Sequence, residues 1–438
     1  MKSQSFRAIR ALSPRRVYFG WWVSIVGACN TVFSAGPTFQ AASVLFKALE
    51  DEFGWSRTLI SGVATVGRLG STLLGPLEGW LIDKFGAGRM VLVGFTVGGG
   101  GLIFFSQVTG PLQFYAAFLV MSVGLSSGGF TPSLTATNAW MNRRRGLGMS
   151  IVEGGVSVGG LLVPLIVWGI SQYGWRSTVL AMGVITILVG PFIARVLGKQ
   201  PTSEQLATQI PGPGERARRV AKESSHDFTV KEALRTRAFW SVSITHMFVN
   251  VSTGAISAHL YLHLTDDDGV GLDLFTAAGV VPIMVATSFV AQLVGGIVGD
   301  LWNKRVLVPF LVLIQGSSLV ILALANSFWM AAAFAIVWGI GFGARTPMLL
   351  AMRGEFFGRR HFATIFVLSS FPMSLGMMIA PVVVGWSYDT FNTYDWSLYV
   401  LAGLCVLGSV TALFAKRPPS PAVRQRLQVR AARRSSAS

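Results

Sequence analysis

Two arginines stand inside long apolar runs, where a charged side chain is costly and is usually retained for a function. Arg68 lies about 11 residues into the run 57–82, which places it roughly 16 Å deep if the run is a helix. Arg345 lies in the run 328–352. The Arg68 guanidinium could grip a carboxylate through two parallel N–H donors, or could form a structural ion pair with an acid on another helix. Arg345, nearer the cytoplasm, could bind substrate or gate the carrier, or could extend its charge to the membrane surface. Both arginines are therefore candidates for binding an anionic solute.

Two acids lie in comparable positions. Glu153 belongs to the run 146–170 and is followed by two glycines that leave room beside it, and Glu78 lies near the end of the run 57–82. A carboxyl removed from water can carry a proton, which would suit coupling, but it can also only pair with a neighbouring polar group. For Glu78 the pairing role is the simpler interpretation. Glu153 and Glu78 are the candidate coupling residues.

Uncharged polar side chains in the apolar runs could hydrogen-bond a solute. The candidates are Asn30, Gln40, His246, Asn250 and Gln292. His246 lies midway along its run, one helical turn before Asn250, and could titrate, bind solute or simply pack with a satisfied ring. His259 and His263 lie near the end of the same run, so we expect them at the membrane interface.

The elements that must position these residues are apolar runs long enough to cross a membrane. The chain is 52% hydrophobic and 13% charged, against about 25% charged in average soluble proteins. A crossing helix needs about 20 mostly apolar residues. Continuous runs of this kind favour helices over a membrane barrel of short alternating strands. Twelve runs qualify: 19–46, 57–82, 89–107, 112–139, 146–170, 177–197, 238–263, 275–299, 305–325, 328–352, 361–386 and 396–415.

The formal net charge of +17 follows from membrane topology. If both termini are cytoplasmic, 31 of the 36 Lys and Arg residues lie in cytoplasmic segments, including three counted between the tenth and eleventh runs: Arg353, Arg359 and Arg360. This is the positive-inside pattern, and anionic lipid of the inner leaflet would attract the same residues. We therefore predict a multi-pass protein of the cytoplasmic membrane with both termini inside, and no nucleic-acid partner.

The polar segment 199–236 divides the chain into two halves that repeat each other. We predict a six-helix bundle over 1–198, a cytoplasmic linker over 199–236, a second bundle over 237–416 and a disordered tail over 417–438. Gly79 stands four residues before Asp83, and Gly296 stands four residues before Asp300, at an offset of 217 between the aspartates. A parallel repeat of this kind predicts a substrate site near the membrane midplane between the halves.

These residues resemble the signature of the major facilitator superfamily. The first copy consists of Gly79, Asp83, Lys84, Gly86 and Arg89, and the degraded second copy consists of Gly296, Asp300, Lys304 and Arg305. The segments 52–62, 173–183 and 385–397 look like bacterial monocarboxylate-transporter-like carriers, which include oxalate–formate-type antiporters. The resemblance implies an all-α membrane protein of twelve helices in two six-helix bundles. It also implies a non-enzymatic carrier that acts as a monomer without a cofactor or metal.

The signature suggests a conformational latch. Asp83 and Arg89 flank a Gly-bearing turn, and an ionised pair there could hold the helix end to a neighbour in one state and release it in another, unless the turn is only structural. One feature departs from the family. Monocarboxylate-type carriers usually have an arginine in helix 8, where this chain has Gln292. Either Arg68 or Arg345 takes its place, or the substrate is not a simple monocarboxylate.

Three functions remain open from the sequence. The first is a secondary active carrier for a small organic anion, coupled to protons or to anion exchange. The second is a carrier of the same fold for a neutral or cationic solute, including efflux of toxic compounds. The third is a membrane receptor or assembly subunit that does not transport. No nucleotide-binding loop or hydrolase motif is visible, so no enzyme activity is expected.

Overall fold

The predicted all-α architecture is confirmed. The computed structural model describes residues 18–35, 42–142, 144–159, 162–207, 227–266 and 269–419, and these residues form helices and no strand. Gln40 lies outside the described residues. Arg68 lies in a described helix, but its side chain is outside the described part.

The first half contributes the six crossings predicted from its apolar runs. The first crossing consists of α2 and α3, the fourth of α6 and α7, and the fifth of α8 with the start of α9. The helix α9 bends at Gly174, which has a φ of 76°, and then continues as the sixth crossing. The helices are α2 Phe19–Ala35, α3 Ala42–Phe53, α4 Arg57–Phe85, α5 Ala87–Ser106, α6 Pro111–Gly128, α7 Phe130–Trp140, α8 Arg145–Gly159 and α9 Val163–Leu197.

The second half contributes the other six crossings. Two short helices, α10 Ser203–Ala207 and α12 Val230–Leu234, belong to the segment between the halves. The remaining helices are α13 Arg237–Thr265, α14 Leu274–Ala278, α15 Val280–Leu301, α16 Lys304–Ala323, α17 Phe328–Phe357, α18 Phe362–Phe391 and α19 Asp395–Leu413.

The hydropathy of the described helices fits a membrane environment. Eight segments are long and apolar enough to cross a bilayer, and one of them, Arg145–Leu197, is long enough for two crossings. The other crossings, α2, α4 and α13, are shorter or more polar. Many large apolar side chains are exposed, such as Leu73, Phe192 and Val382. Such exposure would be unfavourable in water and is expected where lipid is the solvent.

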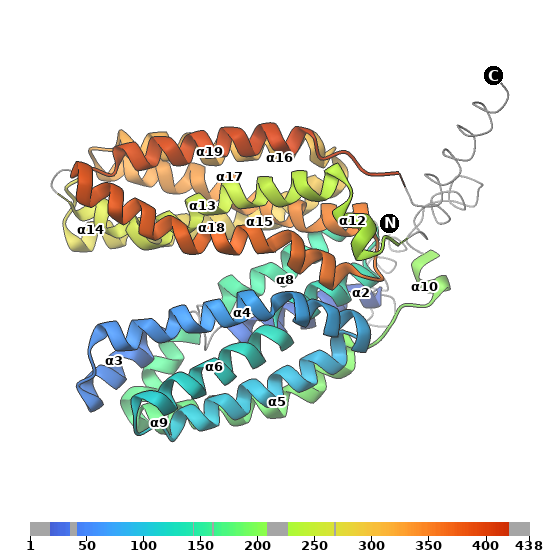
Figure 1. The fold of residues 1–438 in the computed structure, drawn as a ribbon, viewed down its shortest axis with the longest axis horizontal. Coiled ribbons are helices and arrows are strands. Elements are labelled where there is room, and N and C mark those ends of the chain that lie inside the picture. The colour runs from blue at the N-terminus through green and yellow to red at the C-terminus, as the bar shows by residue number, and fades with distance from the viewer. Residues whose placement is uncertain are drawn as a thin grey trace, which may run out of the picture.

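The two bundles lie side by side and meet at one end (Figure 1). There α4 packs on α18, and α8 packs on α15 and α17. In Figure 1 the ribbons of α4 and α18 converge toward α12 and diverge toward α3 and α14. We call the converging end, where the signature residues Asp83 and Asp300 lie, the closed end.

Candidate functional site

A carboxylate of the first half caps a helix of the second half at the closed end. Asp83, near the end of α4, accepts hydrogen bonds from the backbone N–H of Ala363 at 3.0 Å and of Thr364 at 2.8 Å, and from the Thr364 hydroxyl. These residues begin α18. The first N–H groups of a helix have no partners within it and carry a partial positive charge, so they favour an anion.

The second signature copy makes the same contact in the opposite direction. Asp300, near the end of α15, accepts from the backbone N–H of Gly146 at 2.8 Å and of Leu147 at 2.9 Å, at the start of α8. Lys304 lies 3.7 Å from this carboxylate and 2.7 Å from Glu355. Each half therefore caps one helix of the other half.

The signature glycines allow these helix ends to approach. A Cβ on Gly79 would lie 2.9 Å from the Thr364 Cα, and a Cβ on Gly296 would lie 2.9 Å from the Leu147 Cα. Any larger residue would push the capped helix away from its aspartate. The glycine and the aspartate of each copy thus act on the same helix end.

The basic residues of the signature have different surroundings from those expected. Arg89 is exposed, and Asp83 joins α4 to a neighbouring helix end through the donors of α18, so in the state described the contact is made by Asp83 and not by an Asp83–Arg89 pair. Lys84 lies over the Trp80 ring at 4.5 Å, and Arg305 donates from Nε to the Ala415 carbonyl at 3.1 Å. Gly86 forms the turn between α4 and α5 with a φ of 86°.

A second feature is a pair of fully buried arginines on α17. Arg345 donates from Nε to the Gln315 side chain at 2.5 Å, while its Nη1 and Nη2 are buried without a partner. Arg353 is satisfied within its own half. It donates to the Ser369 hydroxyl at 2.7 Å and to the Leu349 carbonyl at 3.0 Å, and its Nη2 lies 2.8 Å from His246 Nδ1.

The assignment of Arg353 to a cytoplasmic loop was wrong. The predicted run ended at residue 352, but α17 continues to Phe357 and is ended by Gly358, which has a φ of 89°. Arg345 and Arg353 are eight residues apart, a spacing that puts two residues on similar faces of a helix. That spacing was the signal in the sequence that could have identified Arg353.

An acid of the first half faces Arg345 across the contact between the bundles. Glu153 on α8 interacts with the side-chain amide of Gln292 on α15 and electrostatically with Arg345. Its Oε2 is buried without a hydrogen-bond partner. Among the described residues, no ion pair within 4.0 Å involves either Glu153 or Arg345. The Nη1 and Nη2 donors of Arg345 and the Oε2 acceptor of Glu153 thus lie at the contact between the bundles without hydrogen-bond partners.

The sequence profile of the Major Facilitator Superfamily matches residues 28–291 and 283–437. The chain belongs to this superfamily. It is 23% identical over 399 residues to monocarboxylate transporter 13 of Bos taurus, covering 89% of this chain and 88% of that protein. It is 25% identical over 398 residues to monocarboxylate transporter 3 of Rattus norvegicus, covering 89% and 79%. The chain is also similar in fold to a crystal structure of the superfamily transporter FucP in the outward conformation. The TM-score is 0.69 with 14% identity, over 91% of this chain and 100% of that one.

Membership makes this protein a multi-pass membrane carrier for a small molecule, and not an enzyme. The described residues contain no group of His, Cys, Asp or Glu side chains that could hold a metal ion.

Two other predicted site residues of the carrier have their partners within one half. Asn30 donates from its side chain to the carbonyls of Gly128 and Gly129, both at 2.8 Å, which ties α2 to the joint between α6 and α7. Glu78 accepts from the hydroxyls of Ser126 at 3.2 Å and Ser127 at 2.8 Å. These contacts give both side chains a role within the first bundle.

The polar residues of α13 lie in the interior of the second bundle. The Asn250 side chain donates to the His246 carbonyl one turn earlier, at 2.8 Å. Gln292 and His246 are both buried. The structure thus brings Glu153, Gln292 and Arg345 together, and joins His246 to Arg353, while Asn30 and Glu78 lie elsewhere.

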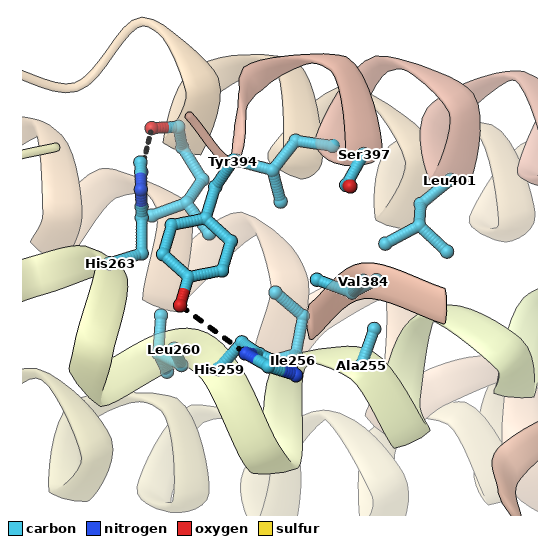
Figure 2. A pocket seen from close by; sticks show the side chains of 11 residues that line it. Ala255, Ile256, His259, Leu260, His263, Val384, Tyr394, Ser397 and Leu401 are labelled. Atoms are coloured by element: carbon cyan, nitrogen blue, oxygen red, sulfur yellow. Dashed lines mark hydrogen bonds between the residues drawn. The ribbon is translucent and has the colours of Figure 1, made fainter. Parts of the chain in front are cut away.

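His259 and His263 lie near the C-terminal end of α13, and their expected position at the membrane interface stays a prediction. Figure 2 shows both rings close to Tyr394, in a small pocket lined by apolar side chains. His263 is buried, with Nε2 3.2 Å from the Leu322 carbonyl. His259 is half-buried and contacts the Pro381 carbonyl at 2.9 Å. These contacts hold α13 to its neighbours at the end opposite the closed end.

Proposed function

We propose that this protein is a secondary carrier for small organic anions, carboxylates in the first place, and that it works by alternating access. The observation that supports this most is Arg345, with Nη1 and Nη2 buried and unpartnered. A buried charged donor without an acceptor is costly, and a carboxylate would satisfy both nitrogens at once through parallel hydrogen bonds. Relatives named as monocarboxylate transporters support the same class of substrate.

The interlocked ends of the two bundles support alternating access. The contacts of Asp83 and Asp300 join the halves at one end only, so the opposite state must break them. We assign the closed end to the cytoplasm, because the basic signature residues and the segment between the halves lie there. Both termini would then lie in the cytoplasm. The carrier would lie in the cytoplasmic membrane and function as a monomer, and its two bundles would span 1–198 and 237–416.

Arg68 stays a second candidate for the anion, because its position in α4 is near the midplane by sequence. Coupling would be to protons or to a counter-anion. Of the two candidate acids, Glu153 is better suited, because its partners come from the other half, whereas Glu78 is bound by serines of its own half.

The proposal can be tested with purified protein and a panel of formate, acetate, lactate and oxalate, with small amines as the comparison. Carboxylates are expected to raise the thermal unfolding temperature of the wild type. Arg345→Lys keeps the positive charge but loses the two parallel N–H donors of the guanidinium. Binding should therefore weaken by about 1.5–3 kcal/mol, roughly 10- to 150-fold. Arg345→Gln should abolish protection. Arg195→Gln, which changes an exposed arginine of α9, is the matched control and should bind normally.

Protection by amines and by no carboxylate would favour the carrier for a cationic solute instead. Carboxylate binding that survives in Arg345→Gln but is lost in Arg68→Gln would move the anion site to α4.

A further inference from the structure

An arginine of α17 fixes the protonation of a buried histidine on α13. Arg353 Nη2 lies 2.8 Å from His246 Nδ1, and both side chains are buried. A guanidinium has N–H donors and no acceptor, so Nδ1 must be the acceptor in this hydrogen bond. An imidazole that accepts at Nδ1 is neutral and carries its proton on Nε2. The contact therefore determines both the charge and the tautomer of His246.

Arg353 is held in this position by two further acceptors. Its Nε donates to the Ser369 hydroxyl of α18 at 2.7 Å, and its Nη1 donates to the Leu349 carbonyl at 3.0 Å. A guanidinium stays charged throughout the physiological pH range. A proton on His246 Nδ1 would bring a second positive charge against it and turn one N–H group toward another. His246 thus takes up a proton only if Arg353 moves away.

The acids on the neighbouring helices have partners of their own or lie far along the helix. The described titratable or charged side chains on α13 and on the helices packed against it are Arg237, His259, Tyr261 and His263 of α13, Lys231 and Glu232 of α12, Lys304 and Arg305 of α16, Arg345, Arg353 and Glu355 of α17, Tyr388 and Asp389 of α18, and Asp395, Tyr399 and Cys405 of α19. Glu232 completes the capping box of α12, and Glu355 binds Lys304. The two aspartates lie near the ends of α18 and α19 that are remote from the closed end. Of these groups, Arg353 is the one that is hydrogen-bonded to the His246 ring.

The other ring nitrogen of His246 is accessible. Nε2 forms no hydrogen bond with the described residues, and it is not one of their fully buried unpartnered atoms. The residue as a whole keeps an exposed fraction of 5%. Because the tautomer places the proton on Nε2, this nitrogen is an N–H donor that a solute could reach.

His246 lies at nearly the same depth as Arg345. It stands nine residues after the start of α13, and Arg345 stands twelve residues before the end of α17, which gives depths of about 14 and 18 Å from the closed end. Gln315 of α16 connects the two helices at this level. Its Oε1 accepts from Arg345 Nε at 2.5 Å, and its Nε2 donates to the carbonyl of Val249, one turn after His246, at 3.4 Å. A solute bound by Arg345 would therefore lie close to the Nε2–H group of His246.

We propose that Arg353 is a positioning residue that holds His246 as a neutral Nε2–H donor, and that this donor binds an oxygen of the transported solute. The donor is the same at mildly acidic and at neutral pH, so His246 contributes to solute affinity without carrying a proton. The solute contact rests on the proposed carboxylate site at Arg345, whereas the tautomer does not depend on the substrate.

The first test observes the tautomer by nitrogen NMR of protein with isotope-labelled histidine. The His246 signal is assigned by its loss in His246→Asn. In the wild type it should show a neutral Nε2–H imidazole that does not titrate between about pH 5.5 and pH 8, a range that spans the ordinary titration of histidine. Arg353→Met removes the donor and the positive charge, so the His246 signal should then titrate or become a mixture of the two neutral tautomers.

The matched control is Arg237→Met, which changes an exposed arginine of the same helix as His246 and should leave the signal unchanged. A wild-type His246 that titrates in this range, or that carries its proton on Nδ1, would overturn the proposal. An unchanged signal in folded Arg353→Met would show that Arg353 does not position the ring. Should that variant not fold, the wild-type signal alone decides the tautomer.

The second test concerns the solute contact. His246→Asn puts an Oδ1 acceptor where Nδ1 lies, so Arg353 keeps a partner while the Nε2–H donor is lost. The probe is whichever of formate, acetate, lactate and oxalate protects the wild type best. Its binding should weaken about tenfold in His246→Asn, by the same factor at about pH 6 and pH 8, because the donor is neutral at both. Saturating the wild type with the probe should shift the Nε2 signal.

The control for the second test is His263→Asn, which removes a buried histidine at the far end of the same helix and should bind the probe normally. Wild-type affinity in His246→Asn, or an Nε2 signal that does not move at saturation, would overturn the solute contact. A weakening that differs between the two pH values would mean that His246 titrates.

Failure of the proposed substrate class would give a different result. If no carboxylate protects the wild type, that class is wrong, and the first test still decides the tautomer. Protection by amines alone would also exclude the solute contact, because an ammonium group has no acceptor for the Nε2–H donor.

Discussion

Replacement of Asp83 by asparagine should weaken the closed end. The carboxylate accepts from two backbone N–H groups and one hydroxyl at the start of α18. Asparagine keeps one acceptor oxygen, turns an N–H₂ group toward the same donors and removes the negative charge. A hydrogen bond to a charged acceptor contributes about 1.5–3 kcal/mol, and a charge at a helix N-terminus about 0.3–1 kcal/mol, or up to about 2 kcal/mol when partly buried.

A net loss of about 2–3 kcal/mol is therefore expected in the state described here, since asparagine recovers part of one contact. Under the proposed alternating access, the opposite state lacks this contact, so the substitution does not change its free energy. The equilibrium between the states should shift by roughly 30- to 150-fold toward opening of the closed end. Substrate affinity should change little if both states bind substrate equally, while turnover slows because one state becomes too populated.

The shift can be measured with spin labels on the two halves at the closed end. Arg89, in the first turn of α5, and Arg360, on the α17–α18 connection, are exposed there. Both can be changed to cysteine after Cys29 and Cys405 are replaced by serine. Asp83→Asn should add a population of longer distances.

The matched control is Asp273→Asn. Asp273 caps α14 through the backbone N–H groups of Phe275 and Thr276, at 3.0 and 3.1 Å, within one half. An unchanged distance distribution in Asp83→Asn would refute the reasoning, and so would an equal shift in Asp273→Asn.

Three further predictions concern the second signature copy, the surroundings of Arg345 and the membrane orientation. Asp300→Asn should shift the spin-label distances in the same direction as Asp83→Asn, and a shift toward closure would contradict the shared role of the two signature copies. Gln315→Leu removes the acceptor of Arg345 Nε, so carboxylate binding should weaken about tenfold; a wild-type dissociation constant would show that Gln315 does not position Arg345. A cysteine at Ser225 should resist an impermeant maleimide added outside intact cells, and ready labelling there would reverse the assigned orientation.

The architecture could be predicted from the sequence because the bilayer leaves few alternatives. A backbone in lipid must satisfy its hydrogen bonds internally, so each long apolar run has to be a helix. The helix ends were harder to predict, because a charged residue near the end of a run looks like the start of a loop. Arg353 was misassigned for this reason. The helix ends at Gly358, where the backbone adopts a positive φ, and not at the first charge.

The contacts of the site could not be predicted, because they join residues far apart in the chain. Asp83 was expected to pair with nearby Arg89, yet its partners lie 280 and 281 residues away. A sequence motif identifies the acid but not the helix end that it caps. Its partners are backbone N–H groups, which almost every residue has, so the sequence does not mark them. The Glu153–Gln292 contact likewise depends on how the two bundles meet.

The position of Arg345 offers a physical answer to the missing helix-8 arginine. Gln292 occupies that place on α15, but α15 and α17 pack closely along their lengths, so a guanidinium from α17 can reach the same region. Glu153 interacts with both Gln292 and Arg345, which means that the amide and the cation face one acid of the opposite half. Under the proposed function, the cation that binds the carboxylate is Arg345 of α17, in place of an arginine on the neighbouring α15. A double exchange, Gln292→Arg with Arg345→Gln, should then restore carboxylate binding that Arg345→Gln alone abolishes. Persistent loss in the double variant, with normal folding, would mean that the anion site depends on α17 itself and not on the charge it contributes.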